Sequence, residues 1–254
     1  TKYAETTYSF STGLNTLNNI VAVDGSNVVL YPNSNHQLFY STDFGDTWVE
    51  GREWRTTNQA LPAEIPGAYD GLCPKAWKFY NGRWYAVLVP YTDNSNFNYT
   101  YKCYIGYLDT DMLTWVAGPP LPNGHYATGD AFYIEVDGSL VFAGRDSVGS
   151  GTSIRRFTST LGDAVAITST QLTTDQQAWG LWPFAGGYAV GLTNGNFYYV
   201  DSSLNILGSR SYSPVTGYGA VPTGASFGVW DTATSNDELL VRVDFTDYSA
   251  DPHA

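Results

Sequence analysis

One arrangement of apolar and polar residues recurs along the chain. An apolar run rich in β-branched and aromatic residues, a short turn with glycine, and a second apolar run follow one another at residues 20–31, 77–89, 132–144 and 181–193. The predicted turns are Asp24-Gly25, Asn81-Gly82, Asp137-Gly138 and Gly186-Gly187. Because such pairs supply the positive φ angles of tight hairpins, each copy predicts a β-hairpin. The flanking runs are almost continuously apolar, which predicts strands buried on both faces.

A second hairpin is expected after each of these. The four segments are QLFYSTDFGDTWVE, CYIGYLDTDMLTWVAG, IRRFTSTLGDAVAITS and FYYVDSSLNILGSRSY, each with a strand, a polar turn and a short outer strand. Two hairpins give four antiparallel strands, and the unit returns about every fifty residues. A four-stranded sheet repeated at that period is typical of a β-propeller blade. The chain is therefore predicted to be all-β.

A fifth, less regular copy completes the predicted ring. The segment SFGVWDTATSNDELLVRVDF, residues 226–245, gives one hairpin with a longer loop. We expect the polar and aromatic segment at 5–12 to add an outer strand to this last sheet, because ring closure hides sheet edges. The prediction is a single five-bladed β-propeller domain over residues 1–254, with the N-terminal strand closing the last blade. Its blades cover approximately residues 14–60, 69–122, 125–174, 176–214, and 218–254 plus 5–12.

Composition agrees with this fold class and excludes several partners. Aromatic residues make up 16% of the 254 residues and charged residues 14%, a mix that favours strands over helices. The net charge is −12, with four lysines and eight arginines, so nucleic acid is not expected as a partner. No apolar run is long enough to cross a membrane, so no membrane insertion is expected.

Cysteine and histidine positions point away from a metal site. Cys73 and Cys103 lie outside any CxxC pair, and the three histidines are scattered along the chain. A zinc site is therefore not expected, and no other metal or cofactor is predicted. We expect two buried thiols, with a single Cys73–Cys103 disulfide as the alternative.

The segment at 41–48 reads STDFGDTW, a compact turn sequence. Asp43 can accept hydrogen bonds from backbone N–H groups of its own turn, Gly45 can adopt a positive φ angle, and Trp48 can cover the turn. The segment resembles the Asp-box, or BNR repeat, of sialidase-type propellers, whose pattern S-x-D-x-G-x-T-W it fills at Ser41, Asp43, Gly45, Thr47 and Trp48. The second unit has a worn copy, LDTDMLTW. The resemblance implies a structural role on an outer hairpin, away from the central site.

Candidate ligand-binding residues lie in the inter-blade loops, which precede the first strand of each predicted blade. In a propeller these loops converge at one mouth. Aromatic faces can stack on sugar C–H surfaces, and carboxylates and amides can bond hydroxyl groups. The alternative is that the aspartates cap the loops and the aromatic rings fill the seams between blades. The candidate ligand-binding residues are Tyr69, Asp70, His125, Tyr126, Asp130, Gln177, Trp179 and Tyr218.

Sialidase and glycosidase activities would each need particular side chains around the same site. Sialidases use three arginines on the substrate carboxylate, but none of the eight arginines lies in the inter-blade loops, so the resemblance does not carry that activity over. Five-bladed glycosidases use three carboxylates around the channel, one of them a protonated glutamic acid. Here the candidate set is Glu135, predicted to lie in an inner strand, with Asp70 and Asp130.

The sequence favours a non-catalytic surface recognition module that binds a glycan or a partner protein. The alternative is a glycoside hydrolase of a five-bladed propeller type. Few lysines and many Asn, Thr, Ser, Tyr and Gly residues resemble the composition of extracellular adhesive proteins and of bacteriophage tail and fibre proteins. That likeness implies an extracellular or virion-surface location, with neighbouring virion proteins as further partners.

Overall fold

The computed structural model describes most strands of the chain and the turns within their hairpins. The residues described are 19–32, 37–53, 71–91, 103–121, 132–145, 151–163, 165–174, 176, 178–192, 196–211, 226–235 and 238–246. Within this part, no helix is long and apolar enough to span a membrane.

The described strands form four four-stranded antiparallel sheets and one hairpin, each built from consecutive segments of the chain. The first sheet contains β1 (Asn19–Asp24), β2 (Asn27–Pro32), β3 (Gln37–Ser41) and β4 (Val49–Glu53). The second contains β5 (Gly71–Tyr80), β6 (Arg83–Tyr91), β7 (Tyr104–Leu108) and β8 (Trp115–Ala117). The third contains β9 (Phe132–Ile134), β10 (Leu140–Arg145), β11 (Thr152–Phe157) and β12 (Thr168–Gln171). The fourth contains β13 (Ala178–Phe184), β14 (Gly187–Leu192), β15 (Asn196–Val200) and β16 (Ile206–Ser211), and the hairpin pairs β17 (Ser226–Ser235) with β18 (Glu238–Thr246).

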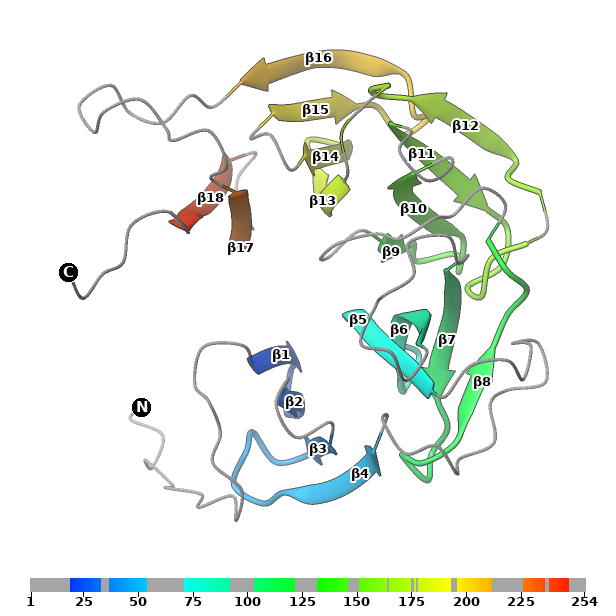
Figure 1. The fold of residues 1–254 in the computed structure, drawn as a ribbon, viewed down its shortest axis with the longest axis vertical. Helices are drawn as coiled ribbons and strands as arrows, with labels where there is room; N and C mark the ends of the chain where they lie inside the picture. Colours follow the sequence, from blue (N-terminus) through cyan, green and yellow to red (C-terminus); the bar gives the residue numbers. More distant parts are fainter. Residues whose placement is uncertain are drawn as a thin grey trace.

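The sheets are arranged around a common centre (Figure 1). The first strands lie innermost and contact one another in chain order, β1 with β5, β5 with β9, β9 with β13 and β13 with β17, while the fourth strands lie outside. The all-β class and the four-stranded antiparallel units are therefore confirmed, and the arrangement is propeller-like. The segment at 5–12, predicted to close the ring, lies outside the described residues.

The inner hairpin turns follow the predicted pattern with shifts of register. Asn81-Gly82 is the predicted two-residue turn, with φ angles of 47° and 75°. The other three predictions are wrong in detail, because the turns are Gly25-Ser26, residues 136–138, and Ala185-Gly186. Gly187 belongs to β14 instead of the turn, because it pairs with Phe184. A Cβ at this position would collide with the carbonyl oxygen of Val200 on the neighbouring strand, which explains why the residue is glycine.

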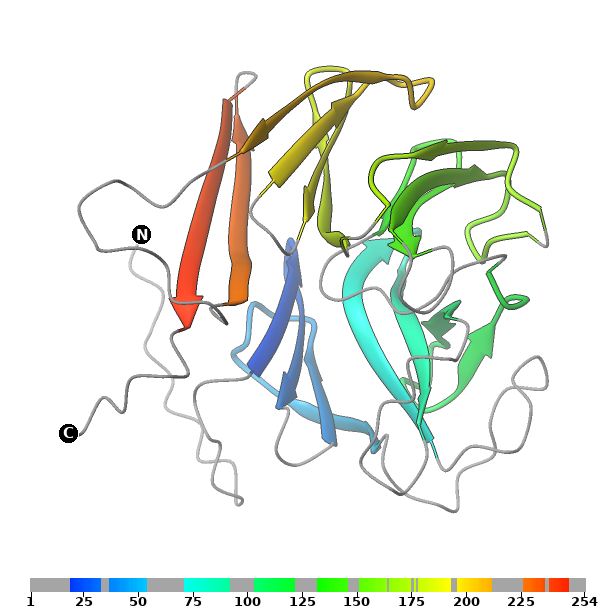
Figure 2. The same cartoon turned by 45° about the horizontal axis from the view of Figure 1, so that its top comes forward.

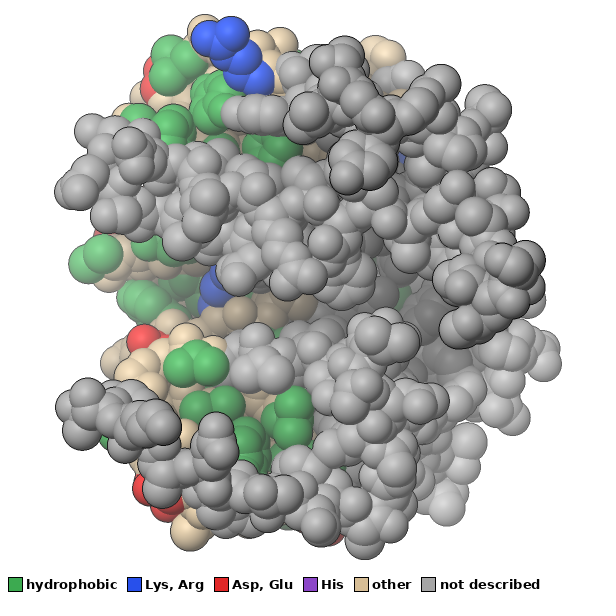
Figure 3. Space-filling view, turned by 90° about the vertical axis from the view of Figure 1, so that its left-hand side faces the viewer, with side chains coloured by type: hydrophobic (Ala, Val, Ile, Leu, Met, Phe, Trp, Pro, Cys, Tyr) green, Lys and Arg blue, Asp and Glu red, His purple; other side chains and the backbone are tan. Residues whose placement is uncertain are grey.

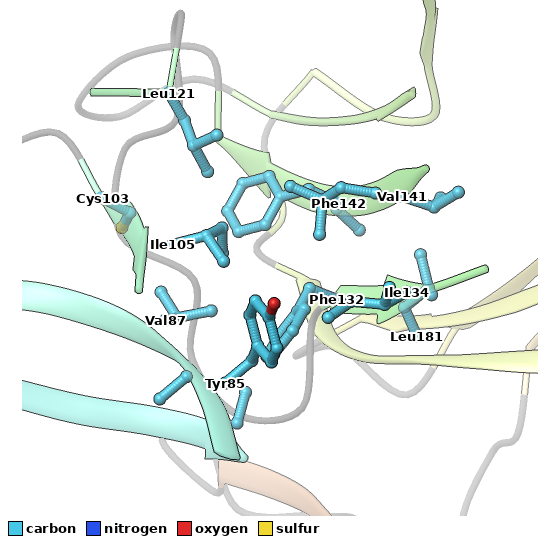
Figure 4. Packing of buried hydrophobic residues seen from close by; sticks show 14 of the residues in the cluster. Tyr85, Val87, Cys103, Ile105, Leu121, Phe132, Ile134, Val141, Phe142 and Leu181 are labelled. Atoms are coloured by element: carbon cyan, nitrogen blue, oxygen red, sulfur yellow. The ribbon is translucent and has the colours of Figure 1, made fainter. Parts of the chain in front are cut away.

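The core fills the seams between neighbouring sheets. β14 is buried along its whole length and β10 along all but its last residue, which confirms the prediction of second strands covered on both faces. Figure 4 shows side chains from the second, third and fourth sheets, among them Val87, Phe142 and Leu181, packed in one cluster. Cys103 is fully buried there, as predicted, whereas the side chain of Cys73 lies outside the described part.

Candidate functional site

The strand order gives every sheet two different ends. Because the strands are antiparallel, the turn between the first and second strands and the turn between the third and fourth strands lie at the same end, which we call the turn face. The inter-blade loops lead into the first strands and so belong to the opposite end. Figure 2 shows the strands running between these two ends. In the four-stranded sheets, every turn of the turn face lies within the described residues apart from residue 164.

The β3–β4 turn is organised by the carboxylate of Asp43. Its Oδ1 accepts the backbone N–H of Thr47 at 2.9 Å and the hydroxyl of Ser41 at 2.7 Å, and its Oδ2 accepts the Thr47 hydroxyl at 2.6 Å. These bonds, with the Thr47 hydroxyl first, lower the pKa of Asp43 from its ordinary value to about 2. Gly45 has a φ angle of 90° and donates its N–H to the Ser41 hydroxyl. The turn chemistry predicted for Asp43 and Gly45 is therefore confirmed.

Trp48 covers this turn from a half-buried position. Its indole lies against Gly45, where an added Cβ would be 3.4 Å from Trp48 Cζ2. The worn second copy differs, because its tryptophan, Trp115, is 5% exposed and packs against Trp77 with 5.6 Å between ring centroids. The two tryptophans therefore pack differently: Trp48 covers a surface turn, whereas Trp115 belongs to the core.

An aspartate organises each of the other three outer turns as well. Asp111 accepts the N–H groups of Leu113 and Thr114 and the Thr114 hydroxyl. Asp163 accepts the N–H and hydroxyl of Thr158 from across its turn, and Asp201 accepts the N–H and side-chain amide of Asn205. These bonds lower the pKa values of Asp163 and Asp201. Sequence analysis missed Asp201, although an aspartate before Ser-Ser-Leu-Asn is a recognisable turn former.

Left-handed residues in the outer turns divide into two groups. Met112 and Leu204 have φ angles of 54° and 66°, and both side chains are buried in the core. Phe44 also has a positive φ angle, 61°, but the residue is 63% exposed. Its backbone N–H donates to the carbonyl oxygen of Ser26 at 2.9 Å, which holds Phe44 beside the β1–β2 turn.

Glu135 belongs to a polar cluster between the third and fourth sheets. The prediction that it lies in an inner strand is wrong, because β9 ends at Ile134 and the Glu135 N–H donates to Ser139 across a longer turn than expected. Arg156 Nη2 lies 3.3 Å from Glu135 Oε1 and 3.0 Å from the hydroxyl of Tyr188. Burial raises the pKa of Glu135, and Arg156 opposes this by stabilising the carboxylate. The cluster ties two neighbouring sheets together at the turn face.

Exposed apolar side chains gather at the turn face. Every exposed large hydrophobic side chain in the described ranges lies in one of its turns or within four residues of one. They are Val23, Phe44, Val49, Leu113, Val136, Val165, Ile167, Ile206 and Leu207. In the side view of Figure 3, hydrophobic and acidic side chains of described residues are seen next to each other.

The predicted ligand-binding residues lie almost entirely outside the described part of the chain. Trp179 lies in β13, but its side chain is outside the described part of the chain. The remaining predicted contacts also lie outside the described residues, as do two of the three candidate catalytic carboxylates. The residues outside the described part are Tyr69, Asp70, His125, Tyr126, Asp130, Gln177 and Tyr218, and Asp70 and Asp130 are the two carboxylates. Their arrangement relative to Glu135 therefore stays a prediction.

Comparisons with known proteins give distant structural similarity alone. No family model matches the chain, and no curated protein sequence matches it. BamB from Moraxella catarrhalis is 10% identical, with 92% of this chain and 58% of that chain covered at a TM-score of 0.46. YCF48 from Cyanidioschyzon merolae is 12% identical, with 87% of this chain and 65% of that chain covered at a TM-score of 0.48. The GH43_1 enzyme from Xanthomonas citri complexed with xylotriose is 14% identical, with 86% of this chain and 79% of that chain covered at a TM-score of 0.47. The chain thus spans less than two thirds of BamB and YCF48, and similarity at these values carries no conclusion about function.

Proposed function

We propose that the chain is a non-catalytic recognition module that binds a glycan or a partner protein at a cell or virion surface. Its frame is a closed five-bladed propeller, in which the segment at 5–12 adds a strand to the β17–β18 hairpin. The contacts between successive first strands, from β1 to β17, support this frame. The acid-centred turn at 41–48 supports its membership of the Asp-box propellers.

The glycan site of this proposal lies at the inter-blade loops. Tyr69, Tyr126, Trp179 and Tyr218 supply stacking faces, and Asp70, His125, Asp130 and Gln177 supply hydrogen-bonding groups. A glycan held between aromatic faces and a few polar groups needs no charged substrate and no metal. The charge of −12 is consistent with a neutral or basic ligand.

The position of Glu135 is the observation that supports binding without catalysis. Glycosidase carboxylates lie about 5–10 Å apart around the scissile bond. Glu135 lies after the last residue of β9, in the turn that leads to β10, and not in an inner strand. Arg156 also holds the Glu135 carboxylate at 3.3 Å, which favours its ionised form. The raised pKa of Glu135 is the one feature that favours the alternative, a glycoside hydrolase using Asp70, Asp130 and Glu135.

A glycan array read for both binding and turnover tests the proposal. The chain is applied to the array, and any bound glycan is then incubated in solution with the chain and examined for new reducing ends. We expect binding without cleavage, and loss of binding in Tyr126→Ala and Trp179→Ala variants that melt normally. Cleavage that disappears in Glu135→Gln would contradict the proposal and establish the hydrolase.

A further inference from the structure

We propose that β16 is a dimerisation edge, at which two copies of the chain pair their β16 strands antiparallel across a two-fold axis. β16 is the outer strand of the fourth sheet and, among the described strands, pairs with β15 alone. Figure 1 shows it at the rim of the molecule. The inference goes beyond the proposed recognition function, because it concerns the rim and does not use the glycan site.

β16 differs from the outer strands of the other three four-stranded sheets. An edge strand presents backbone N–H and C=O groups to a further strand, and short length or charged side chains usually prevent such pairing. β8 has three residues and β12 has four, all of them polar. β4 has five residues, of which three are charged. β16 has six residues, contains no acid and begins with two apolar residues, so it is the edge best suited to pairing.

The first half of β16 is apolar and open. Ile206 and Leu207 are 46% and 69% exposed. The register shift between Tyr199 and Val200 leaves Leu207 without an opposite residue on β15, and such a bulge can redirect a side chain. An added Cβ at Gly208 would meet no atom within 4 Å. Glycine inside a strand often marks a place where another backbone approaches closely.

Charge makes β16 complementary to a second copy of itself. Asp201 lies in the turn before the strand, and the exposed Arg210 lies near the other end of the strand. The side-chain amide of Asn205 lowers the pKa of Asp201, which keeps this carboxylate ionised. Antiparallel pairing therefore brings the negative end of each strand to the positive end of the other. Because a two-fold interface is isologous, this attraction occurs twice.

A two-fold axis through the middle of β16 gives a compatible register. Leu207 of each copy lies opposite Arg210 of the other, so the arginine stem can cover the apolar side chain. The Asn205 end of the turn is two residues further, about 7 Å along the strand, which an extended arginine can span. Gly208 lies opposite Ser209 at the centre, where small residues allow close approach. Pairing of a single edge strand buries a small area, so we expect a dissociation constant in the micromolar range.

Sedimentation equilibrium of the full chain from about 5 to 500 μM tests the inference. We expect a reversible equilibrium between monomer and dimer. Leu207→Lys places a charge on the edge and should weaken dimerisation at least about tenfold without lowering the melting temperature of the monomer. Arg210→Glu should also weaken it, whereas Arg210→Lys should retain it. Val49→Lys is the matched control, because Val49 is 50% exposed in the outer strand β4, and it should dimerise as the unaltered chain does.

Thiol cross-linking tests the arrangement of the two strands. Ser209→Cys places a thiol near the two-fold axis, and oxidation with diamide should join two copies through a disulfide. Ser202→Cys, exposed in the turn before β16, is the control and should stay monomeric. A monomer at every concentration, a dimer that Val49→Lys dissolves, a dimer that survives both Leu207→Lys and Arg210→Glu, or equal cross-linking of the two thiols would overturn the inference. Because Leu207→Lys should leave the glycan array profile unchanged, failure of this edge and failure of the glycan site are separately visible.

Discussion

The Asp43 carboxylate accepts two hydrogen bonds from Thr47, one from the backbone N–H at 2.9 Å and one from the hydroxyl at 2.6 Å. This pair closes the β3–β4 turn, and related aspartate bonds close the three turns at the same place in the other four-stranded sheets. These aspartates therefore serve to build the turns.

Acid should loosen these turns in a defined pH window. The folded-state pKa of Asp43, about 2, lies below its ordinary value of 3.8, so its stabilising contribution is complete above about pH 4 and is lost as pH falls towards 2. The lowered pKa values of Asp163 and Asp201 act in the same direction. Melting temperatures measured from pH 5 to pH 2 should fall steadily, and Asp43→Asn should flatten part of that fall.

Thr47 offers a matched pair of variants for this mechanism. Thr47→Val removes the hydroxyl that contributes most to the lowered pKa of Asp43, so the folded-state pKa should rise towards 3.8 and the acid-induced loss should become smaller and be complete at a higher pH. Thr47→Ser keeps the hydroxyl and should retain the pH profile of the unaltered chain. Identical profiles for the two variants would show that the hydroxyl bond does not control the pKa of Asp43.

Tryptophan substitutions should separate the surface turn from the core. Trp115→Ala removes a ring that is 5% exposed and packed on Trp77, and should cost about 3–5 kcal/mol of unfolding free energy. Trp48→Ala removes a half-buried ring over Gly45, and should cost about 1–2 kcal/mol. Urea denaturation of the two variants measures both values. Equal costs would contradict the assignment of Trp48 to a surface turn.

Much of the fold could be predicted from sequence because hairpin signals are local. Alternating turns and apolar runs indicated four strands per unit, and Asn81-Gly82 was assigned to the correct turn positions. Register was harder, because which glycine belongs to the turn depends on the neighbouring strand. Gly187 is paired in β14, where Val200 leaves no room for a Cβ, and nothing within its own hairpin sequence shows this.

The candidate site was less accessible to sequence reasoning. Glu135 looked like a strand residue because the apolar run continues past it, whereas the structure ends β9 at Ile134. The sequence predicts a structural role for the 41–48 turn and does not single out the exposed apolar residues of the turn face. Phe44, Leu113 and Val136 are apolar residues at turn positions where polar residues are usual.

A glycine pair in the fourth sheet tests the register argument. Gly187→Ala places a Cβ against the backbone carbonyl of Val200, which cannot move without disturbing the β14–β15 pairing. We expect it to cost about 3 kcal/mol or more. Gly208→Ala in β16 has no atom within 4 Å of the added Cβ and should change stability by less than about 0.5 kcal/mol. Chemical denaturation of both variants checks the contrast, and a tolerated Gly187→Ala would refute the close approach.

The ion pair between Arg156 and Glu135 in the third sheet should show its own pH dependence. Because burial raises the pKa of Glu135, ionising this carboxyl in the folded state is unfavourable, and stability is lost as pH rises through that raised pKa. Arg156→Met removes the charge that opposes the shift, so the variant should be about 1–3 kcal/mol less stable at pH 7 and closer to the unaltered chain at pH 4. Adding Glu135→Gln to Arg156→Met removes the unpaired carboxylate and should restore part of the loss at pH 7. A double variant no more stable at pH 7 than Arg156→Met alone would mean that Arg156 acts through its contact with Tyr188, 3.0 Å away, and not through Glu135.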